Sequence, residues 1–158
     1  GGGFLTSPGG DMSGSQSGFA EKVRESQSIR PLTIRQVLAA EASKQADGSF
    51  SIDGHPISLI TLVALLRNRD RQSSFYSFLL DDATGSVDAQ LWANDADPDD
   101  GDKDAQVNEI PYVRIYGQIR VFNGTSRVTV IRIQPVTDRN EITMHMLEAV
   151  YAHLFFTR

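Results

Sequence analysis

The sequence predicts a mainly β protein in which five strands close a small barrel, with a short helix before them and a longer helix after them. Three stretches predict this fold. Residues 57–67 are apolar on both faces, as expected of a strand that curls between two partners in a closed barrel. Residues 112–135 hold two β-rich runs around Asn123-Gly124, the dipeptide most typical of a two-residue hairpin. Residues 141–156 repeat apolar side chains at helical spacing.

The first elements follow from local signals. Residues 1–28 are rich in Gly, Ser and Gln, a composition that buries too little apolar surface to offset chain entropy, so a flexible tail is predicted. Thr33–Gln36 has the pattern of a capping box and opens a short helix that is expected to reach about Ala40. Phe50–Ile52 then begins a small hairpin with Asp53-Gly54 as its turn, just before the long apolar run.

The middle of the chain supplies the next two strands and a long connection. The alternating charges of 67–71 predict a loop, and Phe75–Leu80 and Val87–Trp92 predict the second and third strands. Residues 94–109 follow with seven carboxylates against one lysine, and their proline and glycine argue against a helix. Five strands with a long connection between the third and the fourth match an OB-fold, the five-stranded barrel of many nucleic-acid-binding domains.

The predicted hairpin gives 112–135 a register. The paired positions are Phe122 with Thr125, Arg120 with Arg127, and Gln118 with Thr129. Two arginines directly opposite each other are unfavourable on a solvated sheet face, so this pair predicts a face that meets phosphates. The alternation fails at Arg132, which this register sends inward, and a β-bulge would repair it.

Composition excludes several classes of protein. The 158 residues are 40% hydrophobic and contain no cysteine, which excludes disulfides and thiolate metal sites. The three histidines lack metal-ligand spacing, so no metal or other cofactor is expected, and no apolar run approaches the ~20 residues of a membrane span. No P-loop, Gly-rich dinucleotide turn or nucleophile–His–carboxylate set is present, so no enzyme is predicted. The net charge of −5 is concentrated in 94–109, and twelve of the fifteen cationic residues are arginines.

The outward positions of the strands hold the candidates for a nucleic-acid surface. Trp92 shares its parity with Asp88 and Gln90, so the tryptophan of this chain lies on the polar face, where it either stacks on a base or covers the edge of the barrel. The charged run at 67–71 is either a solvated loop or a contact for phosphates. The candidate DNA-binding residues are Trp92, Phe122, Arg120, Arg127, Arg114, Gln118, Arg69 and Arg71.

From Pro31 to Arg158 the chain resembles the middle subunit of replication protein A, a eukaryotic heterotrimer that binds single-stranded DNA. The resemblance is carried by PLTIRQVL, ISLITLVALLR, DDATGSVDAQLW, YVRIYGQIRVFNG and NEITMHMLEAVYAH. It implies an OB-fold over 29–137 whose stacking aromatics match Trp92 and Phe122. It also implies a nuclear location, and work in DNA replication, repair and recombination. The family also carries a C-terminal winged-helix domain, and these 158 residues are expected to hold no counterpart of it.

The resemblance also implies roles for the two ends of the chain. The C-terminal segment 138–158 is expected to form a helix, capped by Asp138 or Asn140, that packs in a bundle with helices of the large and small subunits. Its apolar surface exceeds a single stripe, although such a helix could instead cap the open end of its own barrel. The interface candidates are Ile142, Met146, Leu147, Val150, Tyr151 and Leu154.

The tail, phosphorylated in this family, offers Ser7, Ser15 and Ser26 as candidate sites, the first before proline and the others before glutamine. Two other functions stay open at this point. One is a structural adaptor whose barrel makes little contact with DNA, and the other is the middle subunit of a related telomere-capping trimer.

Overall fold

The computed structural model describes residues 28–92 and 111–158. The predicted tail, apart from Ser28, lies outside this part of the chain, and so do the candidate phosphorylation sites Ser7, Ser15 and Ser26. The long acidic connection, 94–109, also lies outside it, so the absence of a helix there stays a prediction.

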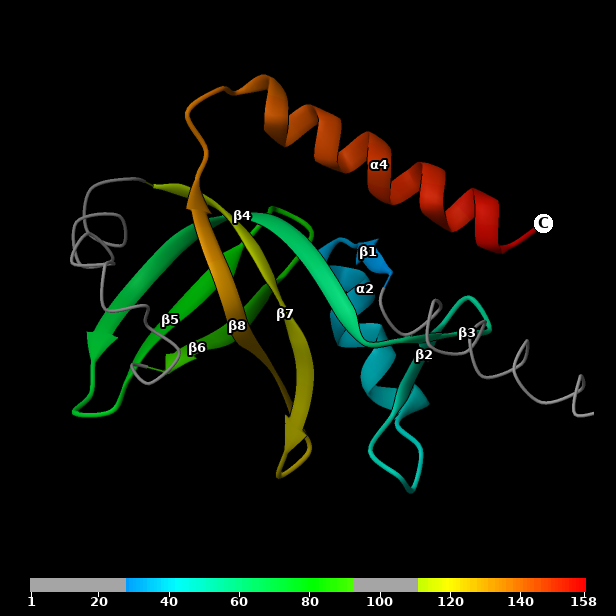
Figure 1. Cartoon of the computed structure of the whole chain (residues 1–158), viewed down its shortest axis with the longest axis horizontal. Helices are drawn as coiled ribbons and strands as arrows, with labels where there is room; N and C mark the ends of the chain where they lie inside the picture. Colours follow the sequence, from blue (N-terminus) through cyan, green and yellow to red (C-terminus); the bar gives the residue numbers. More distant parts are fainter. Residues whose placement is uncertain (1–27, 93–110) are drawn as a thin grey trace, which may run out of the picture.

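A closed five-stranded barrel forms the body of the structure, which confirms the predicted OB-fold (Figure 1). Its strands are β4 (Leu59–Arg71), β5 (Phe75–Asp81), β6 (Ser86–Trp92), β7 (Tyr112–Phe122) and β8 (Thr125–Pro135). The sheet order is β4-β5-β6-β8-β7, and β7 pairs again with β4 to close the barrel. All these pairs are antiparallel except the parallel pair of β6 and β8. A short strand, β1 (Ile29–Pro31), adds to the outside of β4 in parallel.

Strand β4 closes the barrel because it pairs at both of its ends, with β7 over Ile60–Leu65 and with β5 over Leu65–Arg71. The prediction of a loop at 67–71 is therefore wrong. The strand continues through this charged run, with a shift in register between Arg67 and Asp70 where Asn68 adopts a positive φ of 50°. Pairing with β5 satisfies the backbone there, so the charged side chains do not end the strand.

The predicted register of the β7–β8 hairpin is confirmed, with Arg120 opposite Arg127 and Asn123-Gly124 as a two-residue turn in which both residues have positive φ. The expected β-bulge also occurs. Gly117 pairs with Val130 and Tyr116 pairs with Arg132, so Ile131 is the extra residue and Arg132 returns to the outward side. A side chain at Gly117 would collide with the Thr129 carbonyl oxygen, so the close approach of β8 requires glycine here.

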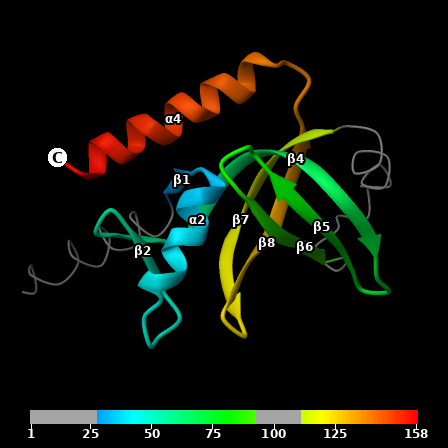
Figure 2. The ribbon, with the colours of Figure 1, turned by 180° about the vertical axis from the view of Figure 1, so that it is seen from behind.

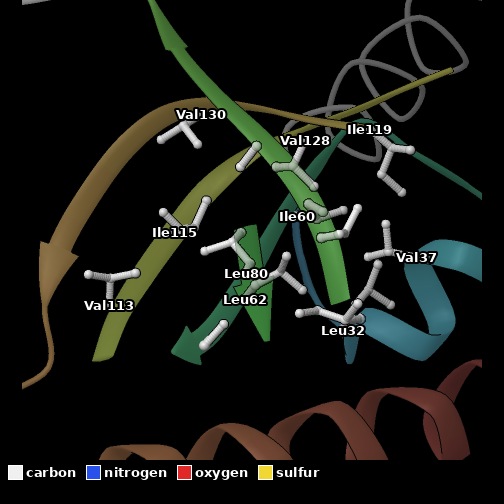
Figure 3. Close-up of a cluster of buried hydrophobic side chains, with 14 of the residues drawn as sticks. Leu32, Val37, Ile60, Leu62, Leu80, Val113, Ile115, Ile119, Val128 and Val130 are labelled. Atoms are coloured by element: carbon white, nitrogen blue, oxygen red, sulfur yellow. The ribbon is translucent and has the colours of Figure 1, made fainter. Parts of the chain in front are cut away.

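The small elements before β4 close one end of the barrel. Helix α2 (Ile34–Ala40) starts with the predicted capping box of Thr33 and Gln36, and a short 3₁₀ turn (Glu41–Ser43) follows it. The hairpin of β2 (Phe50–Ile52) and β3 (His55–Ile57) comes next, and Figure 2 shows α2 between this hairpin and the barrel. Figure 3 shows the shared core, in which Leu32 and Val37 lie against side chains of the barrel strands.

Helix α4 (Asn140–Phe156) crosses over β1 and β4 (Figure 1). Arg139 precedes the helix without a side-chain cap, and the Asp138 carboxylate accepts a bond from the Asn140 backbone N–H at 2.9 Å, so Asp138 caps the first turn as one of the two predicted residues. The buried residues of the helix are His145, Ala149 and Ala152. Small alanines let the helix lie close to the barrel, so its large side chains are left for other surfaces.

Two features of the described residues bear on other classes of protein. None of the helices described is long and apolar enough to cross a membrane. In the same part of the chain no group of three or more His, Cys, Asp or Glu side chains is placed to hold a metal ion.

Candidate nucleic-acid interface and assembly helix

One outward face of the barrel collects four of the eight predicted binding residues, Trp92, Gln118, Arg120 and Arg127, in rows that cross four strands. We call it the sheet face and define it by the outward positions of β5 to β8, where one strand pairs with the next. Its residues are Phe75, Ser77 and Leu79 on β5, Asp88, Gln90 and Trp92 on β6, Arg127 and Thr129 on β8, and Gln118 and Arg120 on β7. The alternate positions, such as Ala89 and Val128, are buried in the core.

Trp92 lies on the sheet face at the end of β6, with 39% of its surface exposed, as the parity predicted. The Phe75 ring packs beside it, with centroids 4.9 Å apart and planes tilted by 46°. This contact holds the indole on one side, and its exposed part suits a stacking platform for a base. Phe75 was missed by the sequence reasoning, although its pairing with Trp92 follows from the antiparallel β5–β6 register.

The charged centre of the sheet face is a single row, Arg120–Arg127–Asp88. Arg120 is exposed and its guanidinium donates to Gln118 Oε1 at 2.6 Å, which orients both side chains along β7. The next row, Gln118–Thr129–Gln90, is neutral and can both donate and accept hydrogen bonds. Asp88 was not among the predicted site residues, because the parallel β6–β8 pairing that brings it to Arg127 leaves no local signal in the sequence.

Phe122 ends β7 opposite Thr125, and the placement of its side chain lies outside what the structure describes. A groove separates β7 from the segment that leads into and out of the β2–β3 hairpin. Gln118 and Arg120 line one wall, and Asp47, Ser49 and Ser58 line the other. The hydroxyl and amide of Ser49 lower the pKa of Asp47 by hydrogen bonding to its carboxylate.

Three predicted arginines are not gathered on the sheet face. Arg114 donates to Glu141 of α4 at 2.7 Å and to the Thr61 hydroxyl at 3.1 Å, with 12% of its side chain exposed. It therefore ties the barrel to α4, which corrects its assignment as a phosphate contact. Arg71 pairs with Tyr76, on the opposite parity from Ser77, and its guanidinium lies 5.5 Å from the Tyr76 ring centre. Arg69 lies within the register shift of β4.

The outer side of α4 presents an apolar surface that we call the helix face. Its six large apolar side chains are each 50–68% exposed: Met144, Leu147, Val150, Tyr151, Leu154 and Phe155. Four of the six predicted interface residues belong to it, while Ile142 and Met146 lie half-buried beside the packed side of the helix. So much contiguous apolar surface marks a site of protein–protein contact.

The C-terminal end of α4 is held by the tip of the β2–β3 hairpin. Asp53, with a φ of 55°, accepts a bond from the buried Arg30 guanidinium and lies 2.9 Å from His153 Nδ1. The Arg30 guanidinium lies 4.3 Å from the Phe156 ring centre, and the His55 ring packs on the same phenyl ring at 4.7 Å. We call Arg30, Asp53, His153 and Phe156 the helix clamp, because they fix the direction in which the helix face points.

The middle of α4 is held by a buried histidine. His145 is 1% exposed, and its Nε2 lies 2.8 Å from the Leu32 carbonyl oxygen. Its Nδ1 has no hydrogen-bond partner among the described residues. Burial lowers the pKa of His145, and the neighbouring Arg114 acts in the same direction. The Leu32 carbonyl, Glu148 and Asp82 act in the opposite direction without cancelling the effect of burial on this pKa.

The comparisons with known proteins agree with this geometry, although no protein-family model matches the chain. A replication protein A 32 kDa subunit of Arabidopsis thaliana is 33% identical over 158 residues, which cover 100% of this chain and 55% of that protein. The replication protein A 32 kDa subunit of Xenopus tropicalis is 34% identical over 159 residues, which cover 98% of this chain and 55% of that protein. The chain spans about half the length of the curated relatives it matches.

Two solved structures have the same fold. A chain from a replication protein A heterotrimer bound to single-stranded DNA is 34% identical, with a TM-score of 0.72, and the match covers 83% of this chain and 99% of that one. A chain of the Schizosaccharomyces pombe Stn1–Ten1 complex is 18% identical, with a TM-score of 0.70 and coverage of 81% and 93%, and so shares the fold alone. The chain therefore belongs to the family of the 32 kDa, middle subunit of replication protein A.

Proposed function

We propose that this chain binds single-stranded DNA through the sheet face and joins a replication protein A-type heterotrimer through the helix face. The observation that carries the proposal is the placement of a partly exposed Trp92 on the same face as the Arg120–Arg127 pair. A stacking ring beside cationic side chains is how domains without sequence preference hold single strands. The related chain of 34% identity comes from a heterotrimer bound to single-stranded DNA.

The helix face supports the assembly half of the proposal. Its apolar side chains are exposed, while Ala149, Ala152 and His145 are buried against the barrel. A helix that only capped its own barrel would bury its large apolar residues and expose its small ones. Here the reverse holds, so the alternative of a capping helix explains the buried side but not the exposed one. The partners we propose are the large and small subunits of the heterotrimer.

The remaining assignments follow the family. We infer that the protein is located in the nucleus and functions in DNA replication, repair and recombination. We also infer that its role is to bind DNA and not to catalyse a reaction. The division into a tail (1–28), a barrel (29–137) and an assembly segment (138–158) belongs to the proposal, as do phosphorylation sites at Ser7, Ser15 and Ser26. A telomere-capping trimer receives less support, since the Stn1–Ten1 chain is 18% identical against 34% for the replication protein A chain.

Binding of fluorescein-labelled oligo-dT, followed by anisotropy, tests the DNA half. The chain is co-purified with the small subunit, so that the large subunit does not hold the same strand and mask the result. Trp92→Ala and Phe122→Ala are each expected to weaken binding by about 1–3 kcal/mol, the usual value of a stacked base. Tyr112→Ala is the control, because Tyr112 is 37% exposed but begins β7, at the opposite end of this strand from Arg120.

Duplex DNA of the same length should bind weakly, since its base faces are already stacked. A Trp92→Ala, Phe122→Ala double variant that binds oligo-dT as tightly as the wild type would refute the proposed face. A structural adaptor with little DNA contact would then be the better description of the barrel.

A further inference from the structure

The sheet face is divided by charge along the boundary between β8 and β6. On β7 and β8 its charged residues are Arg120 and Arg127. On β5 and β6, both described over their full length, its residues include no cation and one carboxylate, that of Asp88. The parallel pairing of β6 with β8 puts Asp88 directly beside Arg127, so the boundary passes between these two residues.

We propose that Asp88 confines the phosphates of bound single-stranded DNA to the β7–β8 side and directs the bases over β6, towards Trp92. This inference rests on the proposed function and adds the orientation of the strand on the face. It also assigns Asp88 the role of limiting affinity, because its carboxylate offsets part of the charge that Arg127 offers to a phosphate.

The chemistry of the row decides where each part of a nucleotide is stabilised. A phosphate above the Arg120–Arg127 pair meets guanidinium donors that suit its oxygens. A phosphate above Asp88, which is exposed, would meet an ionised group that can only accept hydrogen bonds and that repels it.

Bases tolerate the β6 side where phosphates do not. Bases carry no net charge, and their N–H groups can donate hydrogen bonds to a carboxylate oxygen or to the amide oxygen of Gln90. The indole of Trp92 lies further along the same strand, on the same side of the sheet, with Gln90 between it and Asp88. A base displaced from the arginines towards β6 therefore reaches Asp88 in the same row, and further along the strand it meets the neutral Gln90 and then the stacking ring of Trp92.

Asp88→Asn removes the charge and keeps the shape of the side chain. Asp88 is exposed on a strand, so the substitution takes nothing from the core, and Asp88→Ser provides a second variant. In the complex with the small subunit, Asp88→Asn should bind oligo-dT about fivefold more tightly at low salt, the size of one charge contact at about 4 Å in water. The dependence of log K on log salt should steepen by about 0.7, the value of one added phosphate contact on a single strand.

Arg127→Gln separates this role from a general change in charge. Its effect on affinity should be larger in the Asp88→Asn background than in the wild type, because Arg127 then no longer faces a carboxylate. Asp138→Asn is the matched control: it removes the same charge from the exposed segment before α4 and should leave both affinity and salt slope unchanged.

Three results would contradict this role in different ways. Unchanged affinity and slope in both Asp88 variants would overturn the inference and leave the proposed DNA binding intact. Weaker binding by both variants would also overturn it, since Asp88 would then contribute a favourable contact to the strand. If the wild-type complex binds no oligo-dT, the proposed function fails, and this inference fails with it.

Discussion

The sheet face and the helix face both leave large side chains in contact with solvent, but they surround them differently. On the sheet face Trp92 lies on the same side of the sheet as the Gln90–Thr129 row and, one row further along β6, the Arg127–Arg120 pair, so the exposed ring shares its face with polar and cationic side chains. On the helix face six large apolar side chains lie together on one side of α4. The first arrangement suits a ligand with flat rings and negative charges, and the second suits other apolar helices.

The two faces lie on different elements of one small domain, so a DNA strand and a partner helix would contact different residues. The helix clamp and the Arg114–Glu141 ion pair hold α4 against β1 and β4, away from the rows that cross β5 to β8. Changes on one face should therefore leave the other face intact.

Val150→Glu with Leu154→Glu should abolish assembly. Both side chains are more than half exposed in this chain, so the variant should fold, but a partner helix would bury two unpaired carboxylates at a cost above about 3 kcal/mol. Size-exclusion chromatography of co-expressed subunits measures the loss. Arg139→Glu with Asn140→Glu adds carboxylates at the start of the same helix, where the helix dipole favours them, and should still assemble. An intact trimer in the first variant would show that α4 is not the assembly element.

Asp53→Asn should loosen the helix clamp. Asparagine keeps the shape and tolerates the positive φ of this position, but it offers one weaker acceptor to Arg30 and His153. Because Arg30 is buried, the chain should lose about 1–3 kcal/mol of unfolding free energy, measured by urea denaturation, and assembly should weaken with it. Asp47→Asn, in the exposed turn before the hairpin, keeps an acceptor for Ser49 and should lower both quantities much less. If the Asp53→Asn and Asp47→Asn variants have the same free energy of unfolding, the helix clamp does not stabilise the chain.

Arg120→Gln and Arg127→Gln should act on the other face. Each should flatten the salt dependence of oligo-dT binding by up to about 0.7, with a smaller value for Arg127 because Asp88 lies beside it. Assembly, followed in the same samples by chromatography, should not change. Slopes that match the wild type in both variants would identify the two arginines as structural residues of the hairpin.

His145 should make stability depend on pH by a modest amount. Its pKa in the folded chain is lowered by burial, below the value of about 6.5 expected after unfolding. Below about pH 7 the unfolded chain therefore binds more protons at this histidine than the folded chain does. The free energy of unfolding consequently decreases as the pH is lowered. Between a neutral and a mildly acidic buffer, the melting temperature should fall more steeply for the wild type than for His145→Gln. Parallel profiles would assign the acid sensitivity to other groups.

The parts of this molecule that the sequence predicts are those with short-range signals. The Asn123-Gly124 turn fixes the register of β7 with β8, and this register alone places Arg120 opposite Arg127. The parity of β6 puts Trp92 on the outward side for the same reason. Alternation within a strand and a turn of known length carry over directly into structure.

The parts that were missed depend on partners distant in the chain. The charged run at 67–71 continues β4 because β5 pairs with it, a contact that overrides the local preference for a loop. Arg114 meets Glu141, 27 residues further on, and so leaves the predicted phosphate set. Asp88 joins the arginine row through the parallel pairing of β6 with β8, and parallel strands are not joined by a short turn that could be recognised in the sequence. Ala149 and Ala152, which no local signal in the sequence singled out, are the apolar residues that α4 buries against the barrel.

We propose that DNA and partner subunits bind to two separate faces of this chain, and one sedimentation experiment follows both at once. Fluorescein-labelled oligo-dT is sedimented with the complex of this chain and the small subunit, so a single run reports both assembly and binding. The account predicts that Trp92→Ala with Phe122→Ala leaves the complex intact and releases the oligonucleotide, whereas Val150→Glu with Leu154→Glu dissolves the complex itself. If the aromatic variant carries oligo-dT as the wild type does, or if the helix variant sediments as an intact complex, the account is contradicted.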